Sequence, residues 1–138
     1  MGTQRLKRVI LDSNFLFVPF QFKIEIFSEM EALIGRVEPV VLSITIEELN
    51  GLLKKKSEKI RRQVLGALEV AKRCTLVNVE KKPGETFDDV ILRVAREWGC
   101  PVATNDGILR KRLRRLGIAT IFLRQRTRLE IEGYSGNP

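Results

Sequence analysis

The chain has 138 residues, of which 43% are hydrophobic, so its size and composition correspond to one domain that can bury a core. Twenty-five Lys and Arg against 17 Asp and Glu give a formal charge of +8, which favours polyanionic partners, nucleic acid first. Histidine is absent, and Cys74 and Cys100 form no Cys-x-x-Cys pair. The composition therefore excludes zinc sites, thiol redox motifs and mechanisms that need a histidine base.

Apolar runs and amphipathic patterns alternate along the chain. In chain order they predict a strand at 8–11, a helix at about 23–37, a strand at 39–43, a helix from 46, a helix at about 57–73, a strand at 75–79, a helix at 87–98, a strand at 101–104, a short basic helix at 108–116 and a strand at 119–123. The helix from 46 is expected to start at a capping box formed by Thr45 and Glu48.

Short apolar strands that alternate with helices are typical of a parallel sheet covered on both faces. The sequence therefore predicts an α/β fold, a three-layer α/β/α sandwich with a mainly parallel five-stranded sheet. Residues 124–132 alternate weakly and are a candidate edge strand. We expect a single domain over 1–138, with its core at about 8–123 and a basic C-terminal segment at 124–138.

The chain carries no hydrophobic stretch of about 20 residues that could span a membrane. The apolar run before Asp12 is also too short for a signal peptide. We expect a cytoplasmic protein with no membrane partner.

A carboxylate follows each of the first four predicted strands. In order these are Asp12, then Glu47 and Glu48, then Asp88 and Asp89, then Asp106. In parallel α/β folds the ligand site lies beyond the carboxyl ends of the strands, so these acids are expected on one edge of the sheet. Clustered carboxylates in a basic protein repel one another unless cations neutralise them, which favours bound metal. Oxygen ligands suit Mg²⁺ or Mn²⁺, and such ions can activate water against a phosphodiester.

Each acid alone also has a structural explanation. Glu48 fits the capping box, Asp88 and Asp89 complement a helix dipole, and Asp106 is a good N-cap. Asp12 is the strongest candidate, because no regular helix is predicted directly after it.

The acidic motifs also resemble a known family. They are LDSNFL at 11–16, EL at 48–49, FDDVIL at 87–92, and ATND at 103–106 followed by LRKR at 109–112. Their order over residues 10–123 resembles PIN-domain nucleases, with VapC-like toxins as more distant relatives. FVPFQF at 17–22 resembles the branch that processes small-subunit rRNA.

The resemblance implies a metal-dependent endoribonuclease that leaves a 5′-phosphate and a 3′-hydroxyl. Matched by position, the catalytic and metal-binding residues are Asp12, Glu48, Asp88 and Asp106, and the auxiliary residues are Ser13, Thr104 and Asp89. Mg²⁺ or Mn²⁺ is the implied cofactor. Adjacent helical residues point about 100° apart, so Glu47 remains an alternative to Glu48, as Asp89 does to Asp88. The resemblance leaves a homodimer open.

Two basic runs flank the acidic positions. We expect them to bind the RNA backbone through Lys54, Lys55, Lys56, Arg110, Lys111, Arg112, Arg114 and Arg115. Few aromatic residues lie among them, so no base-stacking platform is evident.

Three functions remain open from the sequence. The leading one is an endoribonuclease for rRNA or precursor RNA, with a ribosome-assembly partner. The second is a VapC-type toxin ribonuclease restrained by an antitoxin. The third is a noncatalytic RNA-binding assembly factor that keeps the fold.

Overall fold

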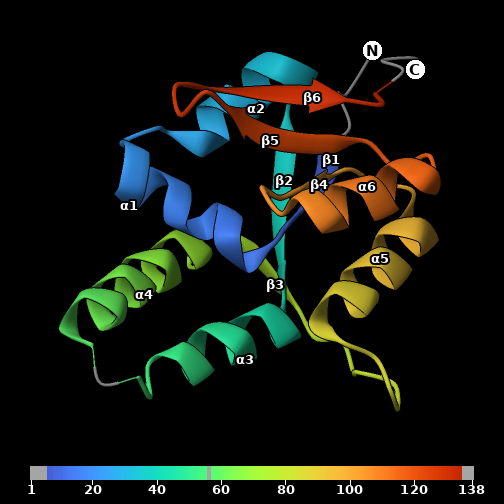
Figure 1. Ribbon diagram of the computed structural model, residues 1–138. Helices are drawn as coiled ribbons and strands as arrows, with labels where there is room; N and C mark the ends of the chain where they lie inside the picture. The colour runs from blue at the N-terminus through green and yellow to red at the C-terminus, as the bar shows by residue number, and fades with distance from the viewer. Residues whose placement is uncertain (1–5, 56, 135–138) are drawn as a thin grey trace.

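The structure is a computed structural model that describes residues 6–55 and 57–134 (Figure 1). The strands are β1 (Lys7–Leu11), β2 (Val37–Leu42), β3 (Thr75–Val77), β4 (Val102–Ala103), β5 (Thr120–Arg124) and β6 (Arg128–Glu132). The helices are the 3₁₀ helix η1 (Ser13–Phe17), α1 (Val18–Phe22), α2 (Ile26–Ile34), α3 (Ser43–Leu52), α4 (Glu58–Ala71), α5 (Phe87–Trp98) and α6 (Gly107–Arg115).

The six strands form one sheet in the order β3-β2-β1-β4-β5-β6. All neighbours are parallel except β5 and β6, which form an antiparallel hairpin. The chain builds outward from β1 to β3 and then crosses back to place β4 on the other side of β1. The gap between the ends of β1 and β4 is thus a topological switch point, the usual ligand position in such sheets.

Side chains alternate across the sheet and build a core on each face. Val9 and Leu11 pack with buried residues of η1, α2 and α4, whereas Ile10 packs with those of α5 and α6. Figure 1 shows the strands running between α1 and α4 on one side and α5 and α6 on the other. The prediction of a mainly parallel α/β/α sandwich is confirmed, and the candidate edge strand is the sixth strand, β6.

Helix α3 lies at the carboxyl edge of the sheet and contributes to both cores. Its Ile44 packs with the α5 and α6 core, and its Leu49 packs with the other core. This double anchoring fixes the rotation of α3 about its own axis, and therefore the direction of its polar residues.

The predicted capping box at Thr45 is wrong. Helix α3 begins at Ser43, two residues before Thr45, and it has no side-chain cap. Thr45 is buried inside the helix, and its hydroxyl has no hydrogen-bond partner among the described residues. The Ser43 hydroxyl instead donates to the Val79 carbonyl and accepts the Val79 N–H, which ties the start of α3 to the segment after β3.

Other boundaries differ from the predictions by a few residues. The predicted helix at 23–37 is shortened to Ile26–Ile34, because Gly35 ends it at φ 91° and β2 already begins at Val37. No helix or strand was predicted for residues 13–22, which form η1 and α1, with Pro19 in the first turn of α1. None of the helices in residues 6–55 and 57–134 is long and apolar enough to cross a membrane.

Candidate active site

Asp12 lies at the switch point, directly after β1, and is only 4% exposed. It caps η1 by accepting the Ser13 N–H at 2.8 Å, and the Thr104 hydroxyl donates to its Oδ2 at 2.7 Å. The pKa of Asp12 is raised from 3.8 to about 6, first by burial and to a smaller extent by the charges of Asp88 and Glu48, although the hydrogen bonds from Thr104 and Ser13 lower it. The carboxylate is thus held in one orientation, but its hydrogen bonds do not fully offset the cost of burying its negative charge.

Glu48 faces the same region from α3. It is half-buried, whereas its neighbour Glu47 is exposed. Burial raises the pKa of Glu48, a hydrogen bond from Ser13 partly offsets this, and the charge of Asp88 raises it again. The structure therefore brings Glu48, not Glu47, next to the other acids.

Asp88 and Asp89 share the first turn of α5 but have different surroundings. Asp89 forms the capping box with Thr86 and pairs with Arg112 at 2.7 Å. Its pKa is lowered, first by the Thr86 N–H and then by Arg112. The pKa of Asp88 is raised by burial and then by the charge of Asp106. Asp88 therefore belongs to the group of unpaired acids, and Asp89 supports the helix that carries it.

Asp106 is the N-cap of α6, as predicted. Its Oδ1 accepts the N–H groups of Ile108 at 2.8 Å and Leu109 at 3.2 Å. The Thr104 hydroxyl that donates to Asp12 also accepts the Asp106 N–H at 3.1 Å. A single hydroxyl thus connects the Asp12 carboxylate to the backbone of Asp106.

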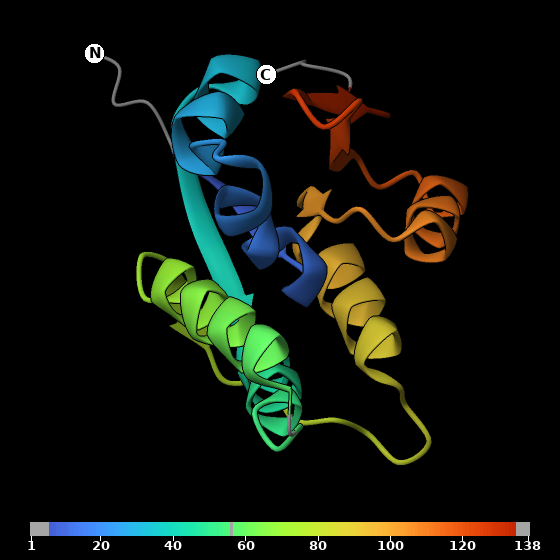
Figure 2. The same ribbon diagram turned by 60° about the vertical axis from the view of Figure 1, so that its left-hand side comes forward.

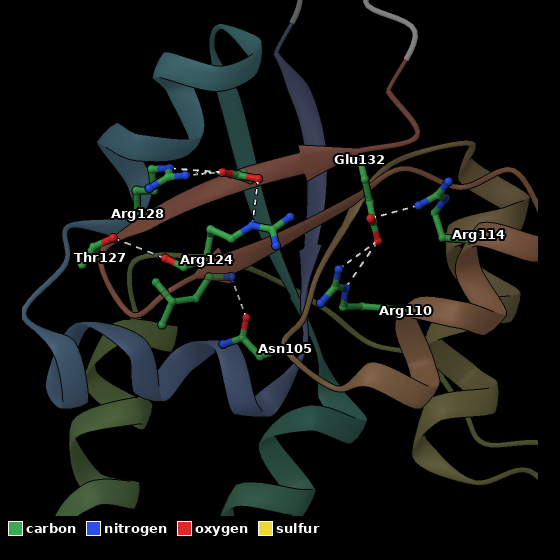
Figure 3. A network of polar contacts seen from close by, with 9 residues as sticks. Asn105, Arg110, Arg114, Arg124, Thr127, Arg128 and Glu132 are labelled. Carbon is green, nitrogen blue, oxygen red and sulfur yellow. Dashed lines mark hydrogen bonds and ion pairs between the residues drawn. The ribbon is translucent and has the colours of Figure 1, made fainter.

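Two asparagines of this site were missed by the sequence reasoning. Asn14 donates from Nδ2 to Asp12 Oδ2 at 3.1 Å and accepts the Asn105 N–H at 3.0 Å. Asn105 in turn accepts the Leu123 N–H at 2.8 Å, which ties the loop after β4 to β5 (Figure 3). The signal was present, because Asn14 stands two residues after Asp12 and Asn105 directly before Asp106, where side-chain amides commonly bond to loop backbones.

Replacing Thr104 with valine should destabilise the protein by about 1–3 kcal/mol. The variant keeps the shape but leaves the buried Asp12 carboxylate without one donor and the Asp106 N–H without its acceptor. Urea unfolding would measure the loss. Thr104→Ser keeps the hydroxyl and is the control, so equal losses in both variants would contradict the assigned hydrogen bonds.

The four carboxylates are close enough for their charges to interact, but they do not converge on one position. Each of the charges of Asp12, Glu48 and Asp106 is coupled to that of Asp88. Nevertheless, in the described part of the chain no three carboxylate or cysteine side chains are close enough to form a ready-made ion site. The donors are oxygen atoms only, and burial, followed by the charges of neighbouring carboxylates, raises the pKa values of Asp12, Glu48 and Asp88, so the donor set fits a hard divalent cation.

The predicted RNA-binding residues have unequal surroundings. Lys54, Lys55, Lys111 and Arg115 are exposed and make no ion pair within residues 6–55 and 57–134. Arg110 and Arg114 pair with Glu132, and Arg112 pairs with Asp89. Lys56 lies outside the described residues, as do the predicted domain ends at 1–5 and 135–138.

The fold and the carboxylate site place the protein in the PIN class. The model of the PIN-like domain family matches residues 9–126, and the chain belongs to this family.

Two named proteins are similar to it. The chain is 34% identical over 128 residues to "Ribonuclease VapC4" of Methanocaldococcus jannaschii, an alignment that covers 91% of this chain and 97% of that protein. The solved structure titled "Structure of the PIN domain endonuclease Utp24" superposes with a TM-score of 0.76 at 26% identity and covers 92% of each chain. The predicted resemblance to PIN nucleases is confirmed, with a VapC ribonuclease and a PIN domain endonuclease among the similar proteins.

Proposed function

We propose that this protein is a metal-dependent endoribonuclease that hydrolyses phosphodiester bonds in RNA. The observation that carries the proposal is the group of four coupled carboxylates at the switch point of a chain with a charge of +8. The names of the two similar proteins, a ribonuclease and an endonuclease, support the same reaction class.

Asp12, Asp88, Asp106 and Glu48 would hold Mg²⁺ or Mn²⁺. A bound divalent ion would supply charge neutralisation at the phosphate and a lowered pKa for an attacking water. Thr104 and Asn14 keep the Asp12 carboxylate in one orientation. Glu48, half-buried and on a different element, is suited to position the water.

The basic residues would hold the RNA on both sides of the acids. Lys54 and Lys55 lie in the turn just after α3, the helix that carries Glu48. The basic face of α6 begins one helical turn after Asp106. Contacts of this kind bind phosphates and position the strand without recognising its sequence.

An RNA cleavage assay with Mn²⁺ or Mg²⁺, with EDTA, and with Asp12→Asn tests the proposal. We expect cleavage only with a divalent ion, and a loss of about a hundredfold or more in Asp12→Asn. Circular dichroism would check that the variant is folded. Undiminished cleavage in EDTA would overturn the metal mechanism. Metal-independent RNA binding that survives Asp12→Asn, with no cleavage by the parent protein, would favour the noncatalytic function.

The biological role has two candidates. The segment at 17–22, which forms the last residue of η1 and all of α1, resembles the rRNA-processing branch and favours processing of rRNA or its precursors. The 34% identity to the named VapC ribonuclease favours a toxin with an antitoxin partner. Induced expression in a host cell separates them, because only a toxin should arrest growth in a way that Asp12→Asn abolishes.

A further inference from the structure

Arginine pairs bridged by a glutamate cover one face of the β5–β6 hairpin and the adjacent side of α6. Glu132 accepts from Arg110 at 3.2 Å and from Arg114 at 2.9 Å. Figure 3 shows the Glu132 carboxylate between these two side chains. Glu130 accepts from Arg124 at 3.0 Å and from Arg128 at 2.8 Å. Each glutamate therefore pairs with two arginines. We call each such group of three residues a triad, and each triad has a net charge of +1.

The alternation of β6 places both glutamates on this face. Leu129 and Ile131 point to the opposite face, where they join the core that contains α2. Phe122 stands opposite Glu130 in the strand register, and its ring lies under the guanidinium groups of Arg110 at 3.8 Å and Arg124 at 5.0 Å. The ring is buried by this stacking, so it connects the two triads into one surface.

Lys111 and Arg115 extend the basic surface along α6. With Gly107, Arg110, Arg114 and Glu132 they line an open groove of about 460 Å³. Both are exposed. We call the two triads together with Lys111 and Arg115 the α6–β6 surface. Its six cationic side chains against two glutamates leave a net charge of +4.

The arrangement is more than a stabilising ion-pair network. One arginine per glutamate would suffice to neutralise the glutamates, yet each glutamate has two, and one arginine of each pair is more than half exposed, with 51% of the Arg114 side chain and 55% of the Arg128 side chain accessible. Each guanidinium presents five N–H donors in a rigid fork, so a carboxylate on one edge leaves donors free for phosphate. The glutamates thus fix the orientation of the guanidinium groups.

We propose that the α6–β6 surface binds the backbone phosphates of a helical RNA segment that flanks the cleaved segment. This inference rests on the proposed ribonuclease function and specifies its substrate. No aromatic ring is exposed on the surface as described, and single-stranded RNA is usually held by such rings. Duplex RNA is recognised mainly by its shape, phosphates and 2′-hydroxyls. The surface begins one helical turn from Asp106, so a duplex on it would lie beside the acids. Figure 2 shows α6, in orange, next to α5, in gold, the helix that carries Asp88.

The test compares two RNAs that share one single-stranded cleavage segment, one of which carries an added hairpin stem. Binding is measured by fluorescence anisotropy in the Asp12→Asn background. Lys111→Glu combined with Arg115→Glu leaves both triads intact. We expect it to weaken binding of the stem RNA about tenfold or more and of the unstructured RNA less than about threefold, and to lower the salt slope for the stem RNA by about two.

Arg36→Glu combined with Arg96→Glu is the matched control. It makes the same charge change at exposed positions before β2 and near the end of α5, away from the acids. Equal losses in the two double variants, or equal losses for the two RNAs, would overturn the proposal. Unchanged binding of the stem RNA would also overturn it and favour an acidic protein partner. If the parent binds the stem through Lys111 and Arg115 but cuts neither RNA, the nuclease proposal fails and the surface assignment stands.

Discussion

Replacing Glu48 with glutamine is expected to slow RNA cleavage by about a hundredfold, whereas Glu47→Gln should stay within about twofold of the parent. The two residues are adjacent and chemically identical, but only Glu48 is half-buried and coupled to Asp88. Removing its charge takes one of the four carboxylates from the site. Removing the charge of Glu47 changes an exposed position of α3.

Single-turnover cleavage of one labelled RNA at saturating protein would measure both variants. Saturation separates a loss of the chemical step from weaker RNA binding. Urea unfolding of each variant would control for stability, since Glu48→Gln keeps the size of the side chain. Equal rates for the two variants, or a greater loss in Glu47→Gln, would contradict the assignment of Glu48 to the site.

Helix phase explains why the sequence alone could not choose between the two glutamates. The local pattern at Thr45 and Glu48 resembles a capping box as closely as the pattern at Thr86 and Asp89, yet only the second forms one. Which pattern caps a helix depends on where the helix starts. For α3 this is set by Ser43 and its two hydrogen bonds to Val79, a contact across 36 residues.

The layers and the strand positions were easier to predict. Buried parallel strands are continuous apolar runs, and the helix at Phe87–Trp98 has a regular apolar stripe, so both signals are local. Asp12 was also identifiable, because a carboxylate at the end of a buried strand has few structural reasons to be there.

The ion pairs of the basic residues could not be predicted. Arg110 and Arg114 stand in a run without acids, which suggested free cations, but β6 brings Glu132 from about 20 residues away. Because β6 is antiparallel to β5 and closes the sheet, its register decides which charges meet. A weak alternation at 124–132 indicated the strand without fixing this register.

In metal-free buffer at pH 7.5, Asp12→Asn is expected to raise the free energy of unfolding by about 2 kcal/mol. The native pKa of Asp12 is about 6, against an ordinary value of 3.8, mainly because of burial. A tenfold change in an equilibrium corresponds to about 1.4 kcal/mol, so ionised Asp12 costs the native state about 3 kcal/mol above pH 6. Asparagine removes the charge, although its amide fits the donors of Thr104 and Asn14 less well.

The raised pKa also predicts how the stability of the protein changes with pH. Between pH 3.8 and about 6 the native state holds a proton on Asp12 that the unfolded chain has lost, so the contribution of Asp12 to stability falls as the pH rises through this window. Below it, both states are protonated, and the advantage of Asp12→Asn should shrink. Urea unfolding in EDTA from pH 4 to 8 would show this convergence.

Asp89→Asn is the control, because it is expected to change the stability in the opposite direction. The pKa of Asp89 is lowered by the Thr86 N–H and by Arg112, so its charge stabilises the native state above its ordinary pKa. Asp89→Asn should therefore be less stable than the parent at pH 7.5. Addition of Mn²⁺ should stabilise the parent more than Asp12→Asn, because an ion that binds the native state offsets the cost of the buried charge. If Asp12→Asn were instead the less stable protein in EDTA at pH 7.5, the Asp12 carboxylate would be a structural group, and the site would not be prepared for a cation.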